Sequence, residues 1–129
     1  MILLDTHALI WFASEPAKLS ENARRSIITA YQAGGIGVSA ISLWEIAWLA
    51  THGRVAFTGT AESFVERISS HTSIRPITPR IALLANQFPD SYSSDPCDRI
   101  IGATALAEGI PLVTKDRNIR AYRGLKTIW

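Results

Sequence analysis

The chain has 129 residues, of which 47% are hydrophobic and 19% charged, with 13 Lys and Arg against 11 Asp and Glu. This composition is typical of a globular protein and excludes a disordered or collagen-like chain. The length favours one domain spanning residues 1–129. No run of about 18 apolar residues occurs, so we expect no transmembrane helix. The first apolar stretch has no basic flank and meets Asp5 at once, so we expect no signal peptide. The single cysteine, Cys97, permits no internal disulfide and is typical of a protein in a reducing cytoplasm.

The first half of the chain predicts two strands, each followed by helices. Short apolar runs are typical of buried strands, whereas Ser or Thr before an apolar periodic segment indicates a helix N-terminus. We expect Thr6 to cap the helix after the first strand and Ser42 to precede the helix after the second. In chain order, the expected elements are a strand at 1–4, helices at 7–13 and 20–33, a strand at 36–39, and helices at 43–52 and 61–70.

The second half continues the alternation of strands and helices. Thr78-Pro79 and Asp95-Pro96 are typical of an N-cap followed by proline in the first helical turn, and Gly109 is suited to end the longer of these helices. Pro76 favours an edge position for its strand. The order predicts an α/β fold with three layers, α/β/α, and a mainly parallel central sheet of about five strands. The elements are a strand at 73–77, helices at 78–86 and 95–108, a strand at 111–114, a short helix after Asp116 and a strand at 125–128.

Four acidic residues lie where the predicted strands end or the predicted helices begin. Asp5 ends the first strand, and Asp116 follows the 111–114 strand. Glu45 and Asp98 are expected in the first turns of their helices. Right-handed crossovers bring such positions to one rim of a parallel sheet. Carboxylates about 4 Å apart repel by ~4 kcal/mol at an effective dielectric near 20, so the group would bind protons or a cation. Oxygen-only ligands favour Mg²⁺ or Mn²⁺.

Each acid also has a structural explanation when it is taken alone. Asp5 and Asp116 are suited to cap helices, and Glu45 and Asp98 favour helix N-termini through the helix dipole. Together the four favour phosphodiester hydrolysis by a metal-activated water, which needs no nucleophilic side chain. No GxSxG, HExxH or P-loop motif indicates another chemistry. Two alternatives stay open: a non-catalytic module that binds RNA or a protein, and a phosphoryl-transfer protein of receiver or phosphatase type.

Basic residues concentrate toward the end of the chain. Residues 1–65 carry a net charge of −1 and residues 66–129 a net charge of +3. With the four acids set aside, 13 basic groups stand against 7 acidic ones, a balance of +6. A basic surface around an acidic pocket suits a polyanion. The candidate RNA contacts are Arg99, Lys115, Arg117 and Arg120, with pairing to a neighbouring acid as the alternative for Arg99.

Four stretches carry a resemblance to a known family: LDTHALIW at 4–11, SAISLWEI at 39–46, DPCDRII at 95–101 and LVTKD at 112–116. In this order the chain resembles a PIN domain, and more narrowly the VapC toxins of bacterial toxin–antitoxin pairs. The family's acidic positions fall on Asp5, Glu45, Asp98 and Asp116, which the resemblance implies are catalytic and bind the metal. Supporting roles are implied for Thr114, and with less support for Thr6, Ser39 and Asp95.

The resemblance also implies a function. It indicates a Mg²⁺- or Mn²⁺-dependent endoribonuclease that acts in the cytoplasm as the toxin of a type II toxin–antitoxin pair. The implied partners are an RNA substrate, a cognate antitoxin and a second copy in a homodimer, with no membrane. Trp44 and Trp48 share one helix face, which is either packed in the core or a surface for an antitoxin segment or a second copy.

Overall fold

The computed structural model describes residues 1–129 and contains one five-stranded sheet. All neighbouring strands are parallel, in the order β3-β2-β1-β4-β5, which confirms the predicted α/β fold. β3 lies at an edge, as its following proline indicated. The strands are β1 (Ile2–Leu4), β2 (Ile36–Ser39), β3 (Ser73–Arg75), β4 (Leu112–Val113) and β5 (Thr127–Ile128).

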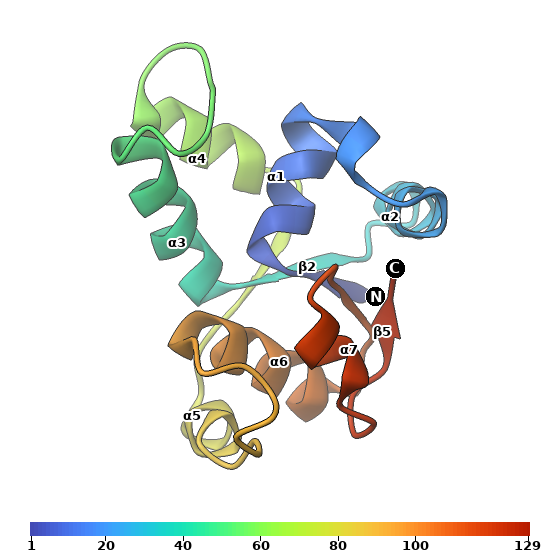
Figure 1. Ribbon diagram of the computed structural model, residues 1–129. Coiled ribbons are helices and arrows are strands. Elements are labelled where there is room, and N and C mark those ends of the chain that lie inside the picture. Colours follow the sequence, from blue (N-terminus) through green and yellow to red (C-terminus); the bar gives the residue numbers. More distant parts are fainter.

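Helices cover both faces of this sheet and complete the three layers. Figure 1 shows α1 to α4 on one side of the strands and α5, α6 and α7 on the other. None of these helices has the length and apolar character needed to cross a bilayer. Their bounds are α1 (Thr6–Ser14), α2 (Glu21–Gln32), α3 (Ala40–Thr51), α4 (Ala61–Ser69), α5 (Pro79–Ala85), α6 (Pro96–Glu108) and α7 (Arg117–Ala121), with a 3-10 turn, η1 (Pro16–Lys18).

The central strand β1 contributes to two separate cores. Successive side chains of a strand point to opposite faces, so Leu4 packs with α1 to α4 while Leu3 packs with α5, α6 and α7. Both residues are completely buried. Burial on both faces holds β1 in place, and with it the residue that follows, Asp5, at the carboxyl edge of the sheet.

Two helices begin earlier than the sequence predicted. The cap of α1 is Asp5, and Thr6 is already the first helical residue. α3 begins directly after β2, with Ser39 rather than Ser42 as its cap. A strand-end residue with a side-chain oxygen can cap the next helix without a connecting loop, and the prediction had assumed such a loop. Glu45 therefore lies in the second turn of α3, not in the first.

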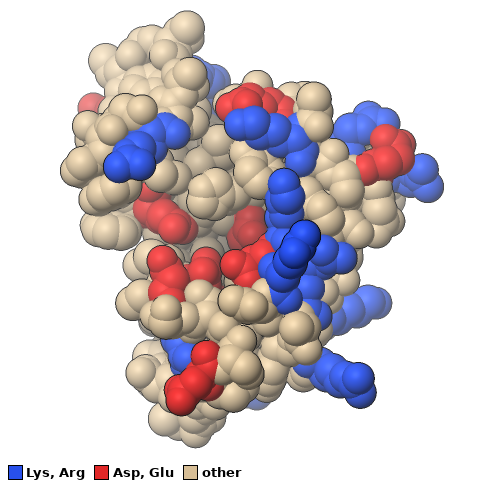
Figure 2. Space-filling view, viewed as in Figure 1, with Lys and Arg blue, Asp and Glu red and all other residues tan.

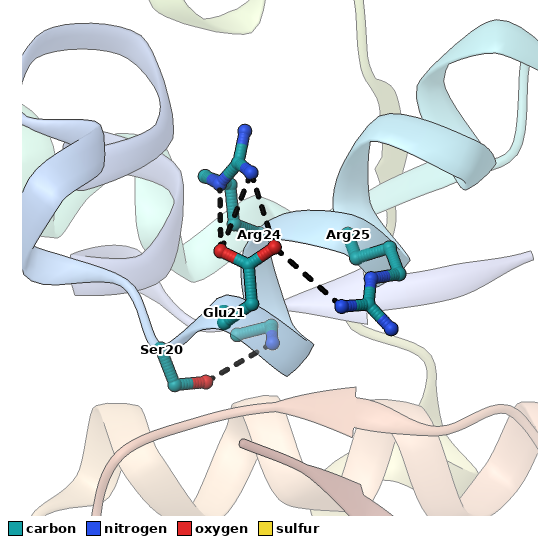
Figure 3. A network of polar contacts seen from close by, with 5 residues as sticks. Ser20, Glu21, Arg24 and Arg25 are labelled. Atoms are coloured by element: carbon teal, nitrogen blue, oxygen red, sulfur yellow. Dashed lines mark hydrogen bonds and ion pairs between the residues drawn. The ribbon is translucent and has the colours of Figure 1, made fainter.

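The start of α2 shows where two of the basic residues are used. Ser20 caps the helix as predicted, accepting a hydrogen bond from Ala23 N at 3.0 Å. Glu21 lies between Arg24 and Arg25, at 3.2 and 3.5 Å (Figure 3). The hydrogen bond from Arg24 lowers the pKa of Glu21. Exposed pairs of this kind add little stability, but the single Glu21 carboxylate partly neutralises the two arginines.

α3 presents an aromatic face to solvent. Trp44 and Trp48 are 59% and 39% exposed, so they do not belong to the core. The Trp48 ring stacks on His52 with 4.1 Å between the ring centroids. This exposure argues against the core packing that was one of the two explanations for these tryptophans.

Candidate active site

A pocket of about 420 Å³ lies at the carboxyl edge of the sheet and contains all four predicted acids. β1, β2 and β4 end at this edge, and α6 begins there because it runs back toward the start of β4. Figure 2 shows acidic side chains gathered in a hollow between α1, α3 and α6. The lining residues are Asp5, His7, Trp11, Glu45, Asp95, Asp98, Lys115 and Asp116.

Asp5 and Asp116 are both helix caps and pocket residues. Asp5 Oδ1 accepts a hydrogen bond from Ala8 N at 2.7 Å, and Asp116 Oδ1 accepts one from Ile119 N at 3.0 Å. The structural explanation of these acids is therefore correct, and it does not compete with a role in the pocket. The cap holds one oxygen of each carboxylate, while both side chains still line the pocket.

Glu45 is oriented by hydroxyl groups buried beside it. The Thr6 hydroxyl donates to Glu45 Oε1, and Thr6 Oγ1 also lies 3.1 Å from Ser42 Oγ. Thr6 and Ser42 are almost completely buried. Ser39, predicted as a supporting residue, instead caps α3 through Ile41 N at 3.4 Å and has no hydrogen bond to any of the acids. The expected support from a hydroxyl is thus visible at Thr6.

Asp95 and Asp98 lie together at the start of α6. Asp95 Oδ1 accepts hydrogen bonds from Cys97 N at 2.7 Å and Asp98 N at 3.2 Å, which makes Asp95 the cap that the sequence predicted. Asp98 Oδ2 accepts a hydrogen bond from the Ser93 hydroxyl at 2.7 Å. The cap leaves both carboxylates on the wall of the same pocket.

Burial and mutual repulsion disturb the ionisation of the pocket. Partial burial raises the pKa of Asp98 to about 6, against the Ser93 hydrogen bond, and the charges of Asp95 and Glu45 raise it further. Burial also raises the pKa of Asp5, although the Thr114 hydroxyl and Ala8 N lower it. Burial, and to a lesser extent neighbouring carboxylates, thus favours the protonated form of two carboxyl groups in one pocket.

Cys97 is not a nucleophile in this setting. Burial and the nearby carboxylates raise the pKa of its thiol to about 11, so it stays protonated at neutral pH.

No basic side chain pairs with the acids of the pocket. The salt bridges of the chain involve Glu15, Glu21 and Glu108, all outside it. Lys115 lines the pocket, but it lies over the Trp11 ring, with Nζ 5.7 Å from the ring centroid. The pocket therefore offers carboxylate oxygens without a protein cation to balance them.

These donors suit a hard divalent cation. Carboxylate oxygens are the ligands of Mg²⁺ and Mn²⁺, and neither a thiolate nor a histidine cluster competes for a softer metal. In the present side-chain positions, no three His, Cys, Asp or Glu groups are close enough to hold one ion. Binding of a divalent cation therefore requires the carboxylates to move closer together. The type of ligand atom in the pocket, carboxylate oxygen, suits such an ion.

The predicted RNA contacts divide into two groups. Lys115, Arg117 and Arg120 are exposed and form no salt bridge. Figure 2 shows a ridge of Lys and Arg beside the acidic hollow, over α7. Arg99 is different, because its guanidinium donates to backbone carbonyls and is not free for a phosphate or an acid. Its acceptors are Ser93 O at 2.6 Å, Phe88 O at 3.1 Å, and Ala85 O and Pro89 O at 3.3 Å.

Sequence reasoning did not single out every residue of the site. Thr114 was predicted to orient a neighbour, and its Oγ1 accepts a hydrogen bond from Asp116 N at 3.1 Å. His7 and Trp11, which were not among the predicted site residues, also line the pocket. Ser93 was not noticed, and nothing in the sequence distinguishes it from the serine that follows it.

Comparisons with known proteins agree with this fold. The PIN domain model matches residues 2–125. Ribonuclease VapC22 of Mycobacterium tuberculosis is 38% identical over 130 residues, which cover 99% of this chain and 98% of that protein. The chain therefore belongs to the PIN-domain family, and within that family to the VapC-type ribonucleases.

Solved structures with lower identity support the fold alone. VapBC2 from Rickettsia felis, bound to a DNA fragment from its promoter, has a TM-score of 0.75 and 16% identity, covering 98% of this chain and 97% of that chain. DNA-bound VapBC from Salmonella typhimurium has a TM-score of 0.71 and 18% identity, with the same coverage. A toxin–antitoxin complex from Klebsiella pneumoniae has a TM-score of 0.69 and 22% identity, covering 97% of this chain and 95% of that chain.

Proposed function

We propose that this chain, acting as a single nuclease domain, is a metal-dependent endoribonuclease and the toxin of a type II toxin–antitoxin pair. The observation that carries the proposal is the pocket in which Asp5, Glu45, Asp98 and Asp116 meet without a basic partner. A relative with 38% identity over nearly the whole chain is a ribonuclease of the VapC type, which supports the same reaction.

The four carboxylates would hold Mg²⁺ or Mn²⁺. Such an ion supplies a Lewis acid that activates water and stabilises charge on the phosphate. The chain's part is to hold its acids in place. Helix caps hold Asp5 and Asp116, Thr6 holds Glu45, and these bonds limit the rotation of each side chain.

Lys115, Arg117 and Arg120 would bind the RNA backbone beside the pocket. All three side chains are exposed, Lys115 lines the pocket and Arg117 directly follows Asp116, so a phosphate chain entering the pocket would meet their charges. Backbone contacts position a nucleic acid without reading its sequence. The ridge would therefore support RNA binding in general, and the protein would meet an RNA substrate in the cytoplasm.

The protein partners would be an antitoxin and a second copy of the chain. The solved structures of similar fold contain toxin–antitoxin complexes, which supports an antitoxin. Exposed Trp44 and Trp48 offer apolar area of the kind that protein interfaces use, and they support a homodimer or an antitoxin contact.

The nuclease proposal is tested by replacing Asp5 with Asn. We expect Asp5→Asn to abolish Mn²⁺-dependent RNA cleavage while the fold survives, because asparagine keeps the oxygen that caps α1 and removes the charge. RNA products are compared on gels with and without a chelator, and circular dichroism checks the fold. Equal cleavage by mutant and wild type would contradict the assignment. RNA binding without any chelator-sensitive product would favour a non-catalytic binding module instead.

A further inference from the structure

The loop between α5 and α6 contacts the acidic pocket through one hydroxyl group. Ser93 Oγ donates to Asp98 Oδ2 at 2.7 Å and accepts a hydrogen bond from Asp95 N at 3.1 Å. The Asp95 N–H occupies a lone pair of the Ser93 hydroxyl oxygen. The single proton of this hydroxyl is therefore directed to the Asp98 carboxylate. A donor fixed in this way to an ionised acceptor makes a strong hydrogen bond.

Ser93 is itself held in place by Arg99. The Arg99 Nε donates to Ser93 O at 2.6 Å, and the other guanidinium nitrogens donate to carbonyls of Ala85, Phe88 and Pro89. The planar guanidinium thus ties the end of α5 and the whole loop to the first turn of α6. This clamp fixes the distance between Ser93 and the residue that precedes Arg99, which is Asp98.

The hydroxyl decides which oxygen of Asp98 is available. Oδ2 is engaged by Ser93, whereas Oδ1 has no hydrogen bond within the protein. The Asp98 side chain lines the pocket, so its unengaged oxygen is the one available to a cation. Without Ser93, both oxygens would be unpaired and the carboxylate would turn more freely.

We propose that Ser93 is a positioning residue for Asp98, clamped by Arg99, and that it sets the affinity of the pocket for a divalent cation. This inference rests on the proposed function, because it takes the pocket to be a Mg²⁺ or Mn²⁺ site. It assigns a role to a loop serine and explains why Arg99 is directed to carbonyls rather than to RNA.

The test is Mn²⁺ binding to the purified full chain, measured by isothermal titration calorimetry. We expect Ser93→Ala to weaken Mn²⁺ affinity about tenfold, the effect of losing one charge-assisted hydrogen bond at a partly exposed site. Ser93→Thr keeps the hydroxyl and is expected to restore affinity. Cleavage by Ser93→Ala should need correspondingly more Mn²⁺, with kcat at saturating Mn²⁺ close to that of wild type.

Ser69→Ala is the matched control, since the Ser69 hydroxyl bonds only to backbone carbonyls of its own helix, at 2.8 Å from Val65 O. Thermal unfolding of every variant separates loss of fold from loss of binding. The inference would be overturned if Ser93→Ala bound Mn²⁺ with wild-type affinity, or if Ser93→Thr did not restore affinity. The nuclease function would still stand in that case, provided that Asp98→Asn loses Mn²⁺ binding. Absence of Mn²⁺ binding and cleavage in the wild type would overturn both.

Discussion

Single residues of the pocket serve the fold and the site at the same time. Asp5 and Asp116 each use one oxygen as a helix cap, and Glu45 accepts a hydrogen bond from Thr6. These contacts oppose the tendency of repelling carboxylates to turn away from one another. The local bonds that stabilise the helices therefore also keep negative charge concentrated, and burial together with neighbouring carboxylates raises the pKa values of Asp5 and Asp98.

Asp98 is expected to make the metal-free protein less stable as the pH rises from about 4 to about 6. Its ordinary pKa of 3.8 rises to about 6 on folding. Between these values the folded protein keeps a proton that the unfolded chain has lost. The free energy of unfolding therefore falls as the pH rises. The stabilisation that the Asp98 proton gives the folded protein is complete only below the ordinary pKa of 3.8, and it is lost as the pH passes about 6. Thermal unfolding in the presence of a chelator, from pH 4 to pH 7.5, measures this loss.

Asp98→Asn is the control for that measurement. Asparagine keeps an acceptor for Ser93 but has no charge. The free energy of unfolding of the Asp98→Asn protein should therefore fall less over the same pH interval, and it should exceed that of the wild type at neutral pH. Identical pH profiles for the two proteins would assign the loss of stability to another group.

At the level of secondary-structure elements, close packing of the 86–94 loop on α6 supports the site. Tyr92 stacks on Phe88 with 4.0 Å between the ring centroids, and its hydroxyl donates to Asp98 O at 3.1 Å. Gly102 leaves the space for this ring, because a Cβ at that position would lie 2.0 Å from the Tyr92 hydroxyl oxygen. A glycine in mid-helix weakens the helix, so here the packing of the loop outweighs helix propensity.

Gly102→Ala is expected to destabilise the protein by about 1–3 kcal/mol, although alanine is the better helix former. The displaced Tyr92 would also loosen the loop that carries Ser93. Denaturant unfolding measures the change in free energy. Adding Tyr92→Phe removes the oxygen that clashes, so we expect this second change to be less damaging in the Gly102→Ala background than in the wild type. Additive effects of the two changes would argue against the clash.

For the whole molecule, the arrangement of charge matters more than its sum. The formal net charge is only +2, yet acids fill the pocket and unpaired basic residues form the adjoining ridge. Basic residues far from the pocket are partly neutralised, as Arg24 and Arg25 are by Glu21. The molecule therefore directs a polyanion to one face without a high net charge.

Removing two charges from the ridge should weaken RNA binding in a salt-dependent way. We expect Arg117→Ala with Arg120→Ala to raise KM and leave kcat nearly unchanged, because backbone contacts position the RNA. The slope of log KM against log salt should fall by about 1.4, or 0.7 for each lost contact to a single strand. Cleavage kinetics between low and physiological salt measure it.

Arg24→Ala with Arg25→Ala removes the same charge from α2, where both arginines already pair with Glu21 (Figure 3). We expect little change in KM from this control. Equal effects of the two double variants would mean that net charge, and not the ridge, governs binding.

The sequence by itself was sufficient for the strand–helix alternation, the parallel sheet and the convergence of the four acids. These depend on local patterns: apolar runs form strands, Asp-Pro begins a helix, and parallel topology brings strand ends to one edge. Asp5 could be placed because it directly follows β1, and Asp116 because it lies in the short loop between β4 and α7. The start of α3 was missed, since Ser39 and Ser42 are both suited to cap a helix and only packing chooses between them.

The tertiary structure alone decided what surrounds those acids. Thr6 and Glu45 are 39 residues apart, and their hydrogen bond exists only because α1 and α3 pack together. Arg99 was open to RNA or to an acid until the loop folded back and presented its carbonyls. Trp44 could be core or surface, and the packing of α3 against its neighbours left this side chain exposed. Side-chain partners of this kind depend on distances between separate elements, which no local pattern encodes.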